Sequence, residues 1–197
     1  MDTDKQGLDQ TKAKLRSEIR GVLNSLSPEE RAADSAKVRA LLPQQSFWKT
    51  AATVLFFAPL PDELDLWPSL EEALAEGKAV ALPCFDADNQ FYSPRRVTNL
   101  HVELVSGRFG IREPAGHCIE IPLDDLDLVL VPGVAFDLRG HRLGRGKGFY
   151  DRLLANFAGK KIGIAFEEQM VEAIPADKQD VRMNFVLTPM RCIKCGP

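Results

Sequence analysis

The stretch DLDLVLVPGVAFDLRGHRLGRGKGFYDRLL, residues 125–154, predicts a buried strand, a glycine-rich turn and a helix. Its first eight residues form a nearly continuous apolar run, which is typical of a strand buried between helices in a parallel sheet. The helix expected at 148–157 has an apolar stripe of Phe149, Leu153, Leu154 and Phe157, which we assign to the core. The turn therefore lies beyond the carboxyl end of a strand, where ligands bind in open α/β sheets.

Similar elements are expected on both sides of this stretch. Further apolar runs predict strands at 52–58, 78–83, 161–166 and 184–189. Amphipathic or capped stretches predict helices at 12–26, 28–42, 66–76 and 167–174. Short strands and turns are expected between 85 and 125. The alternation indicates one Rossmann-like, three-layer α/β/α domain over residues 1–197, with a mostly parallel sheet and with tails at 1–10 and 190–197.

The composition indicates an enzyme of the cytoplasm. The chain has 197 residues, 45% of them hydrophobic, and a formal net charge of −3. This size allows a sizeable core, and the acidic balance argues against a nucleic-acid partner. No apolar run approaches the ~20 residues of a membrane span, and the N-terminal residues lack the apolar core of a secretory signal. We therefore expect a cytoplasmic protein with no membrane partner, as a monomer or weak dimer.

Four cysteines, Cys84, Cys118, Cys192 and Cys195, are expected to be free thiols in a reducing compartment. The last two form the motif CIKC, which could belong to a zinc or redox site. A structural zinc site normally needs a second pair of Cys or His ligands, and none follows in the sequence. We favour tail residues over a metal or redox role.

The glycine-rich turn predicts a phosphate site. Glycines let the backbone approach an anion closely, and a helix N-terminus offers unpaired N–H groups and partial positive charge. The segment also carries four cationic side chains: Arg142, Arg145, Lys147 and Arg152. The alternative is a glycine-rich surface loop with solvated cations. Asp151, just inside the helix, can be read equally well as a residue that stabilises the helix dipole or as a Mg²⁺ ligand.

Two familiar phosphate motifs do not fit the turn. A Walker loop needs Gly-Lys-Ser/Thr four residues after its first glycine, but Lys147 is followed by Gly148. The spacing of Gly144, Gly146 and Gly148 gives GxGxG rather than the dinucleotide fingerprint GxGxxG. The turn must therefore hold phosphate in another way.

These residues resemble the 5-formyltetrahydrofolate cyclo-ligase family, also called 5,10-methenyltetrahydrofolate synthetases. The strongest match is RLGRGKGFYD within the stretch quoted above, with further matches in KAKLR at 12–16, FGIREP at 109–114 and residues 162–188. The resemblance implies a three-layer α/β fold and the ATP- and Mg²⁺-dependent conversion of 5-formyltetrahydrofolate to 5,10-methenyltetrahydrofolate, releasing ADP and phosphate. In the implied mechanism, the formyl oxygen attacks the γ-phosphate, N10 closes the ring and phosphate leaves. Positioning and charge neutralisation should supply most of the catalysis.

The resemblance also implies a role for individual residues. ATP would be bound by Lys12, Arg16, Arg142, Leu143, Gly144, Arg145, Gly146, Lys147, Gly148, Phe149 and Tyr150. The reduced folate would be bound by Ala58, Glu63, Arg145, Gly146, Lys147, Gly148 and Phe149. Arg145, Lys147 and Tyr150 would act in catalysis, and Asp151 and Asn184 would hold Mg²⁺.

Other readings remain open at several of these positions. Without the resemblance, Lys12 and Arg16 are most simply exposed cations, and Glu63 belongs to a solvated acidic loop. Asn184 stands where the family has Asp, so it would offer a metal an uncharged oxygen and weaker binding. Phe149 replaces a common Tyr and lacks its hydroxyl. The Asn184 departure leaves a non-catalytic nucleotide- or folate-binding module as the alternative function.

Overall fold

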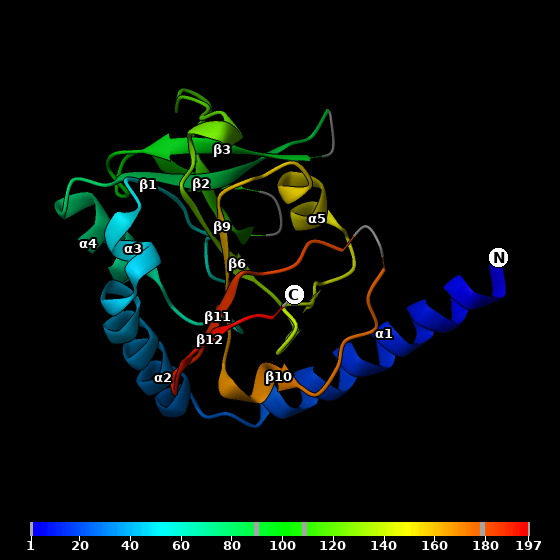
Figure 1. The fold of residues 1–197 in the computed structure, drawn as a ribbon. Coiled ribbons are helices and arrows are strands. Elements are labelled where there is room, and N and C mark those ends of the chain that lie inside the picture. Colours follow the sequence, from blue (N-terminus) through cyan, green and yellow to red (C-terminus); the bar gives the residue numbers. More distant parts are fainter. Residues whose placement is uncertain (1, 89–90, 108–109, 178–179, 197) are drawn as a thin grey trace.

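A seven-stranded, mostly parallel sheet forms the centre of the fold (Figure 1). The computed structural model describes residues 2–88, 91–107, 110–177 and 180–196. The strands lie in the order β12 (Cys192–Lys194), β11 (Phe185–Leu187), β9 (Lys160–Ile164), β6 (Leu128–Pro132), β1 (Thr53–Leu55), β2 (Ala79–Asp86) and β3 (Phe91–Val97). The five inner strands pair in parallel, whereas the edge strands β12 and β3 are antiparallel to their neighbours. The predicted α/β class and mostly parallel sheet are confirmed.

Helices cover both faces of the sheet, but unequally. One face packs against α1 (Asp2–Asn24), α2 (Pro28–Leu41), α3 (Ser46–Thr50) and α4 (Trp67–Ala75). Leu23, Trp48 and Leu70 bury their side chains in this larger core. The other face packs against α5 (Phe149–Leu154), whose Leu153 and Leu154 are buried as predicted. Because α5 has only six residues, the loops that follow the carboxyl ends of the strands have room beside it.

A small sheet fixes the approach to the glycine-rich loop. It has the order β10-β7-β8, with bounds Met170–Val171, Ala135–Asp137 and Arg142–Leu143. The buried carboxylate of Asp137 accepts hydrogen bonds from the backbone N–H groups of Arg139, His141 and Ile174 and pairs with His141 Nδ1 at 3.0 Å. Burial alone would raise the pKa of Asp137, but these hydrogen bonds outweigh it and lower the pKa. Asp137 therefore holds the turn as an ionised carboxylate.

Several predicted elements need correction. Residues 167–174 do not form an α-helix: they contain a 3₁₀ turn, η4 (Glu167–Gln169), followed by β10. The buried Gln169 explains this, because its Nε2 donates to the carbonyls of Gly133 and Val134. The helix expected at 148–157 is only the six residues of α5. The region 85–125 contains β3, β4 (Leu104–Ser106), β5 (Arg112–Pro114) and η3 (Leu123–Asp125), in line with the predicted short strands.

The predicted tails contain regular structure. Residues 2–10 extend α1, which projects past the body of the fold (Figure 1), and Cys192–Lys194 form β12. Cys192 packs on the α1–α4 side of the sheet and Cys195 on the α5 side. Burial raises the pKa of the Cys195 thiol to about 11. The two thiols of CIKC therefore lie on opposite faces of the sheet. They do not come together as a shared metal site or a disulfide between them would require.

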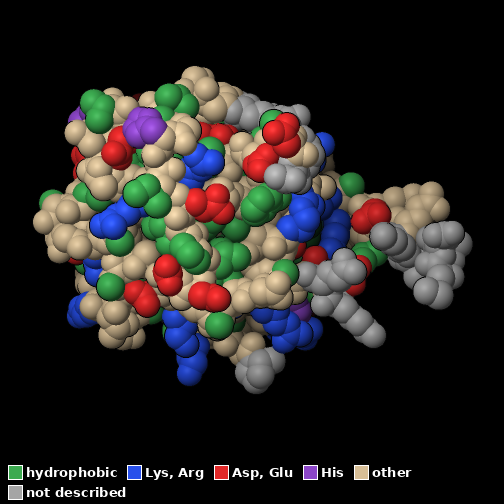
Figure 2. Space-filling view, turned by 90° about the horizontal axis from the view of Figure 1, so that it is seen from above, with side chains coloured by type: hydrophobic (Ala, Val, Ile, Leu, Met, Phe, Trp, Pro, Cys, Tyr) green, Lys and Arg blue, Asp and Glu red, His purple; other side chains and the backbone are tan. Residues whose placement is uncertain are grey.

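The surface carries mixed charge. On the face shown in Figure 2, acidic and basic side chains are interspersed, consistent with a formal net charge of −3. Among the described helices, none combines the length and hydropathy required to cross a membrane.

Candidate active site

A cavity of about 560 Å³ opens beyond the carboxyl ends of β1 and β6. Its walls come from α1, the loop after β1, β2, the β3 hairpin and the glycine-rich loop. The ionisable residues that line it are Asp9, Lys12, Arg16, Glu63, Arg142, Arg145, Lys147, Asp151 and Asp180. Its apolar and aromatic lining includes Phe57, Ala58, Leu60, Pro83, Tyr92, Ile111, Phe149 and Tyr150. The cavity thus joins a strongly cationic wall to an apolar pocket.

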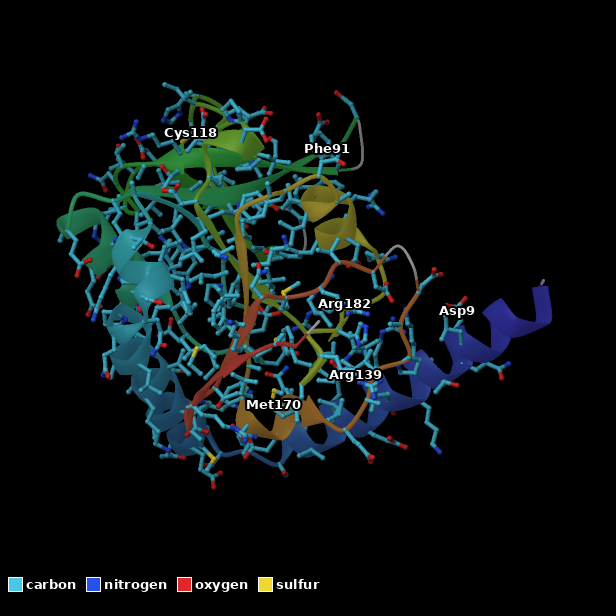
Figure 3. The ribbon with its side chains drawn as sticks, in the orientation of Figure 1. Asp9, Phe91, Cys118, Arg139, Met170 and Arg182 are labelled. Carbon is cyan, nitrogen blue, oxygen red and sulfur yellow. The ribbon has the colours of Figure 1, made fainter. Side chains whose placement is uncertain are left out.

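With one exception, the residues predicted for the site meet at this cavity. Lys12, Arg16, Ala58, Glu63 and the whole run from 142 to 151 contribute to its lining. Asp9 also lines it, and in Figure 3 this residue lies on the projecting part of α1. Three segments that are distant in sequence, 9–16, 58–63 and 142–151, therefore line one cavity. Asn184 is the exception.

The glycine-rich loop needs its glycines. Gly146 has φ +95° and Gly148 has φ +64°, a left-handed backbone region that side chains with a Cβ rarely adopt. A Cβ at Gly144 would lie 2.8 Å from Arg142 Nη1. Gly148 directly precedes α5, but α5 has only six residues. Cationic side chains and loop N–H groups, rather than a long helix dipole, must therefore provide most of the positive field.

The first half of α1 is attached to the site by two polar contacts. Lys12 Nζ lies 2.7 Å from Asp180 Oδ2, and both side chains are mostly buried. Arg16 Nε donates to the Gly144 carbonyl at 2.8 Å, which brings its guanidinium against the glycine-rich loop. Burial and, next in size, the nearby Arg20 lower the pKa of Arg16. These contacts place Lys12 and Arg16 at the cavity although they lie about 130 residues from the loop in sequence.

Arg142 is a buried partner of Asp151. Its side chain is 5% exposed, and its Nη2 donates to Asp151 Oδ1 at 2.8 Å. Nη1 donates to the Pro132 carbonyl at 3.3 Å, and the guanidinium lies 5.6 Å from the centre of the Tyr150 ring. Arg142 therefore orients Asp151 through this hydrogen bond and adds buried positive charge next to the glycine-rich loop. The hydrogen bond with Arg142 involves only Oδ1 of Asp151, a residue that also lines the cavity.

Arg145 reaches across the cavity to the acidic loop. Its Nη2 lies 2.7 Å from Asp62 Oδ1 and 2.9 Å from Glu63 Oε1. Glu63 is deeply buried, and Leu60 N–H donates to its other oxygen at 3.0 Å. Burial raises the pKa of Glu63, although the Leu60 hydrogen bond and the charge of Arg145 oppose the shift. The acidic loop is thus part of the site rather than a solvated loop, and Asp62 belongs to it in addition to Glu63.

Aromatic residues close the apolar side. The Phe149 ring packs edge-to-face on Tyr92, with 5.1 Å between centroids, and on Phe85, at 5.5 Å. These contacts tie α5 to the β2–β3 hairpin. Burial and the nearby Glu63 raise the pKa of Tyr150, so its hydroxyl stays protonated near neutral pH and can donate a hydrogen bond.

Lys147 differs from the other cations of the loop. Its residue is exposed, and no carboxylate of the described residues forms an ion pair with it. Its backbone carbonyl accepts from Arg152 Nη1 at 3.0 Å. Lys147 therefore brings an exposed positive charge to the cavity, where an anionic ligand could pair with it.

Asn184 lies in the sheet, away from the cavity. Its Oδ1 accepts from Lys161 N–H at 2.8 Å and its carbonyl accepts from Cys195 N–H at 3.0 Å. The structure therefore does not bring Asn184 to Asp151 as the predicted second metal ligand. The carboxylate from this segment that does line the cavity is Asp180, which the sequence reasoning left without a role. Its neighbour Gln179, and Phe109 of the FGIREP block, lie outside the described residues.

Asp180 is ionised at neutral pH. Burial alone would raise its pKa, but hydrogen bonds from Asp177 N–H and Lys12 outweigh it and lower the pKa. Within the described part of the chain, no three His, Cys, Asp or Glu side chains cluster as a metal site would require. Asp151 and Asp180 are thus two separate carboxylates at one cavity, the kind of donor set Mg²⁺ completes with phosphate oxygens and water.

Comparison with known proteins identifies the family. Residues 8–189 match the model of the 5-formyltetrahydrofolate cyclo-ligase family. The 5-formyltetrahydrofolate cyclo-ligase of Escherichia coli K12 is 39% identical over 150 residues, covering 72% of this chain and 80% of that protein. The mouse enzyme of the same name is 28% identical over 191 residues, covering 91% and 94%. The solution structure of Aquifex aeolicus 5,10-methenyltetrahydrofolate synthetase superposes with a TM-score of 0.85 at 35% identity, covering 94% and 93% of the two chains. The chain therefore belongs to the 5-formyltetrahydrofolate cyclo-ligase family.

Proposed function

We propose that this protein converts 5-formyltetrahydrofolate to 5,10-methenyltetrahydrofolate, using ATP and Mg²⁺ and releasing ADP and phosphate. The observation that carries the proposal is the cavity, where a glycine-rich cationic loop faces an apolar pocket bearing a buried carboxylate. Phosphoryl transfer needs the first of these and recognition of a flat, polar-edged ring needs the second. We further propose a cytoplasmic monomer or weak dimer that acts without nucleic acid or membrane.

The cationic wall would bind the triphosphate. Lys12, Arg16 and Lys147 reach the cavity from two sides, and backbone N–H groups of the glycine-rich loop add uncharged donors. Arg145 stands between this wall and the apolar pocket, in reach of both substrates. Held in this way, the γ-phosphate and the formyl oxygen would be aligned for direct transfer, which is the main source of rate in such reactions.

The apolar pocket would bind the pterin. Glu63 can accept from ring N–H groups, and its raised pKa reflects the same burial that would strengthen those hydrogen bonds. Ala58, Phe57 and Leu60 flank the position with small and apolar surfaces. Tyr150, as a protonated donor, can hydrogen-bond the formyl or phosphoryl oxygen.

We propose Asp151 and Asp180, rather than Asp151 and Asn184, as the Mg²⁺ carboxylates. Arg142 uses only Oδ1 of Asp151, and Lys12 and Asp177 both use Oδ2 of Asp180. The other oxygen of each carboxylate takes no part in these contacts, and both residues line the same cavity. The ion would neutralise charge on the triphosphate; the protein's part is to hold the two carboxylates in fixed positions.

The test is an assay with purified protein, 5-formyltetrahydrofolate, ATP and Mg²⁺. We expect the absorbance of the methenyl product to grow, and to stop growing when ATP is omitted or Mg²⁺ is chelated. An active enzyme of the family runs in parallel to show that the substrates are competent. Binding of ATP and folate without turnover would instead support a non-catalytic binding module, and neither binding nor turnover would refute both.

A further inference from the structure

Arg145 is held by two acids that lie more than 80 residues away in the chain. Its Nη2 donates to Asp62 Oδ1 at 2.7 Å and to Glu63 Oε1 at 2.9 Å. The Asp62 and Arg145 side chains are 38% and 35% exposed, whereas Glu63 is 10% exposed. One nitrogen therefore joins the glycine-rich loop to the loop after β1, at the mouth of the cavity.

The backbone around Arg145 cannot fix its side chain by itself. Gly144 and Gly146 flank it, and Gly146 has φ +95°. Glycine has the greatest backbone freedom of all residues, so a side chain between two glycines depends on its own contacts for position. The Arg145 guanidinium donates hydrogen bonds to Asp62 and Glu63. The position of this cation is therefore set from the opposite wall.

The two acids are not equivalent partners. Glu63 is already bound to Leu60 N–H, and its burial raises its pKa. Burial alone would also raise the pKa of Asp62, but its hydrogen bond with Arg145 and the charges of Arg145 and Arg20 outweigh it and lower the pKa. Asp62 is thus the ionised partner of Arg145. Without Asp62, the guanidinium would lose the shorter of its two contacts and keep the one to Glu63, so its position would be less well fixed.

We propose that Asp62 is a positioning residue for Arg145, holding its guanidinium between the phosphate wall and the folate pocket. This rests on the proposed function, in which Arg145 meets the transferred phosphoryl group. Asp62 acts through Arg145 and does not itself contact the reacting atoms. Its carboxylate holds the Arg145 side chain in a position that the backbone at Gly144 and Gly146 does not fix by itself.

A double-mutant cycle on the full-length protein tests the proposal. We expect Asp62→Ala to lower kcat about 10-fold or more, since small misplacements of a catalytic group have effects of this size, with KM for ATP changed less than about 3-fold. Asp62→Asn, which keeps Oδ1 but loses the charge, should fall between wild type and Asp62→Ala. In an Arg145→Ala background the Asp62→Ala change should have no further effect. Glu71→Ala, on the exposed side of α4, removes one acidic charge away from the cavity and should leave kcat unchanged.

Equal losses from Asp62→Ala in both backgrounds would show that Asp62 acts independently of Arg145 and would overturn the proposal, as would no loss in either.

A second readout does not need turnover. NMR of the Arg145 guanidinium should show slowed rotation about the Nε–Cζ bond in wild type and Glu71→Ala, and free rotation in Asp62→Ala. Free rotation in wild type would refute the proposal even if the protein were inactive, whereas inactive wild type with slowed rotation would refute only the proposed function.

Discussion

The glycine-rich loop and the first half of α1 both bring cations to the cavity, but they are positioned by different means. The loop follows a turn fixed by the buried Asp137 and takes left-handed conformations at Gly146 and Gly148. The helix carries Lys12 and Arg16, whose side chains bond to Asp180 and to the Gly144 carbonyl. The loop is thus shaped by its own sequence, whereas α1 is placed by docking. We expect loop side chains to govern the rate and α1 side chains to govern affinity.

Loss of Lys147 should have the largest effect. Lys147→Ala removes an exposed cation that we propose to lie at the transferred group, so kcat/KM should fall about 100- to 1000-fold, the usual cost of deleting one donor to transition-state charge. The melting temperature should stay within about 2 °C, because the side chain has little to pack against. Steady-state kinetics and a thermal melt measure both. The matched control is Lys160→Ala, which removes an exposed lysine of β9. Equal losses of kcat/KM in the two variants would contradict a specific role for Lys147.

Asp151→Asn should have the next largest effect. It removes the negative charge that pairs with Arg142 and is proposed to hold Mg²⁺. The Mg²⁺ concentration at half-maximal rate should rise at least about 10-fold, since even loss of an outer-shell partner costs 10- to 100-fold. A Mg²⁺ titration of the rate, with Asp125→Asn on the exposed η3 turn as control, decides this. An unchanged Mg²⁺ requirement in Asp151→Asn would exclude Asp151 as a ligand.

On α1, a smaller and different change is expected. Lys12→Ala should raise KM for ATP about 10-fold, the value of one charge-assisted hydrogen bond, while kcat changes less than about 2-fold. Lys14→Ala offers a control on the same helix, because Lys14 is 79% exposed and pairs with Glu18 in the next turn. If Lys12→Ala lowered kcat and left KM unchanged, the division between rate and affinity would be wrong.

Asn184→Asp should change least. It restores the acid found in the family, yet the side chain at 184 accepts from Lys161 N–H in the sheet rather than facing the cavity. We expect the rate and the Mg²⁺ requirement to stay within about 2-fold of wild type, since a carboxylate oxygen can accept the same hydrogen bond. A marked drop in the Mg²⁺ requirement would place residue 184 at the metal and displace Asp180 from our proposal.

The parts predicted correctly are those set by local sequence. The apolar run at β6 and the spacing of the glycines specify a buried strand and a strained loop wherever they occur. Residues 167–174 had an amphipathic pattern but not a helix, because Gln169 finds hydrogen-bond partners at Gly133 and Val134. Asp62 looked like a solvated acid because its partner Arg145 is 83 residues away. Such tertiary pairs leave no periodic signal in a single sequence.

Asn184 shows a further limit. Its place in the family pattern was recognisable, but the direction of its side chain depends on the pairing of β9 with β11. Asp180 lies in the irregular segment before β11, where it pairs with Lys12, whereas Asn184 directly precedes β11 and its side chain accepts from Lys161 N–H of β9. Only the assembled sheet distinguishes which of the two faces the cavity.

The projection of α1 matters for how the protein should be handled at the bench. Asp9, which lines the cavity, is only seven helical residues from Asp2, or about 10 Å along the helix axis. An affinity tag fused to the N-terminal end of α1 would therefore start close to the cavity, and charged residues of the tag could alter the electrostatic field there. Of the described residues after β11, none lines the cavity. A C-terminal tag is the better choice for kinetic work, and a dye on the exposed Thr11 would test the proposed nucleotide binding without altering the glycine-rich loop.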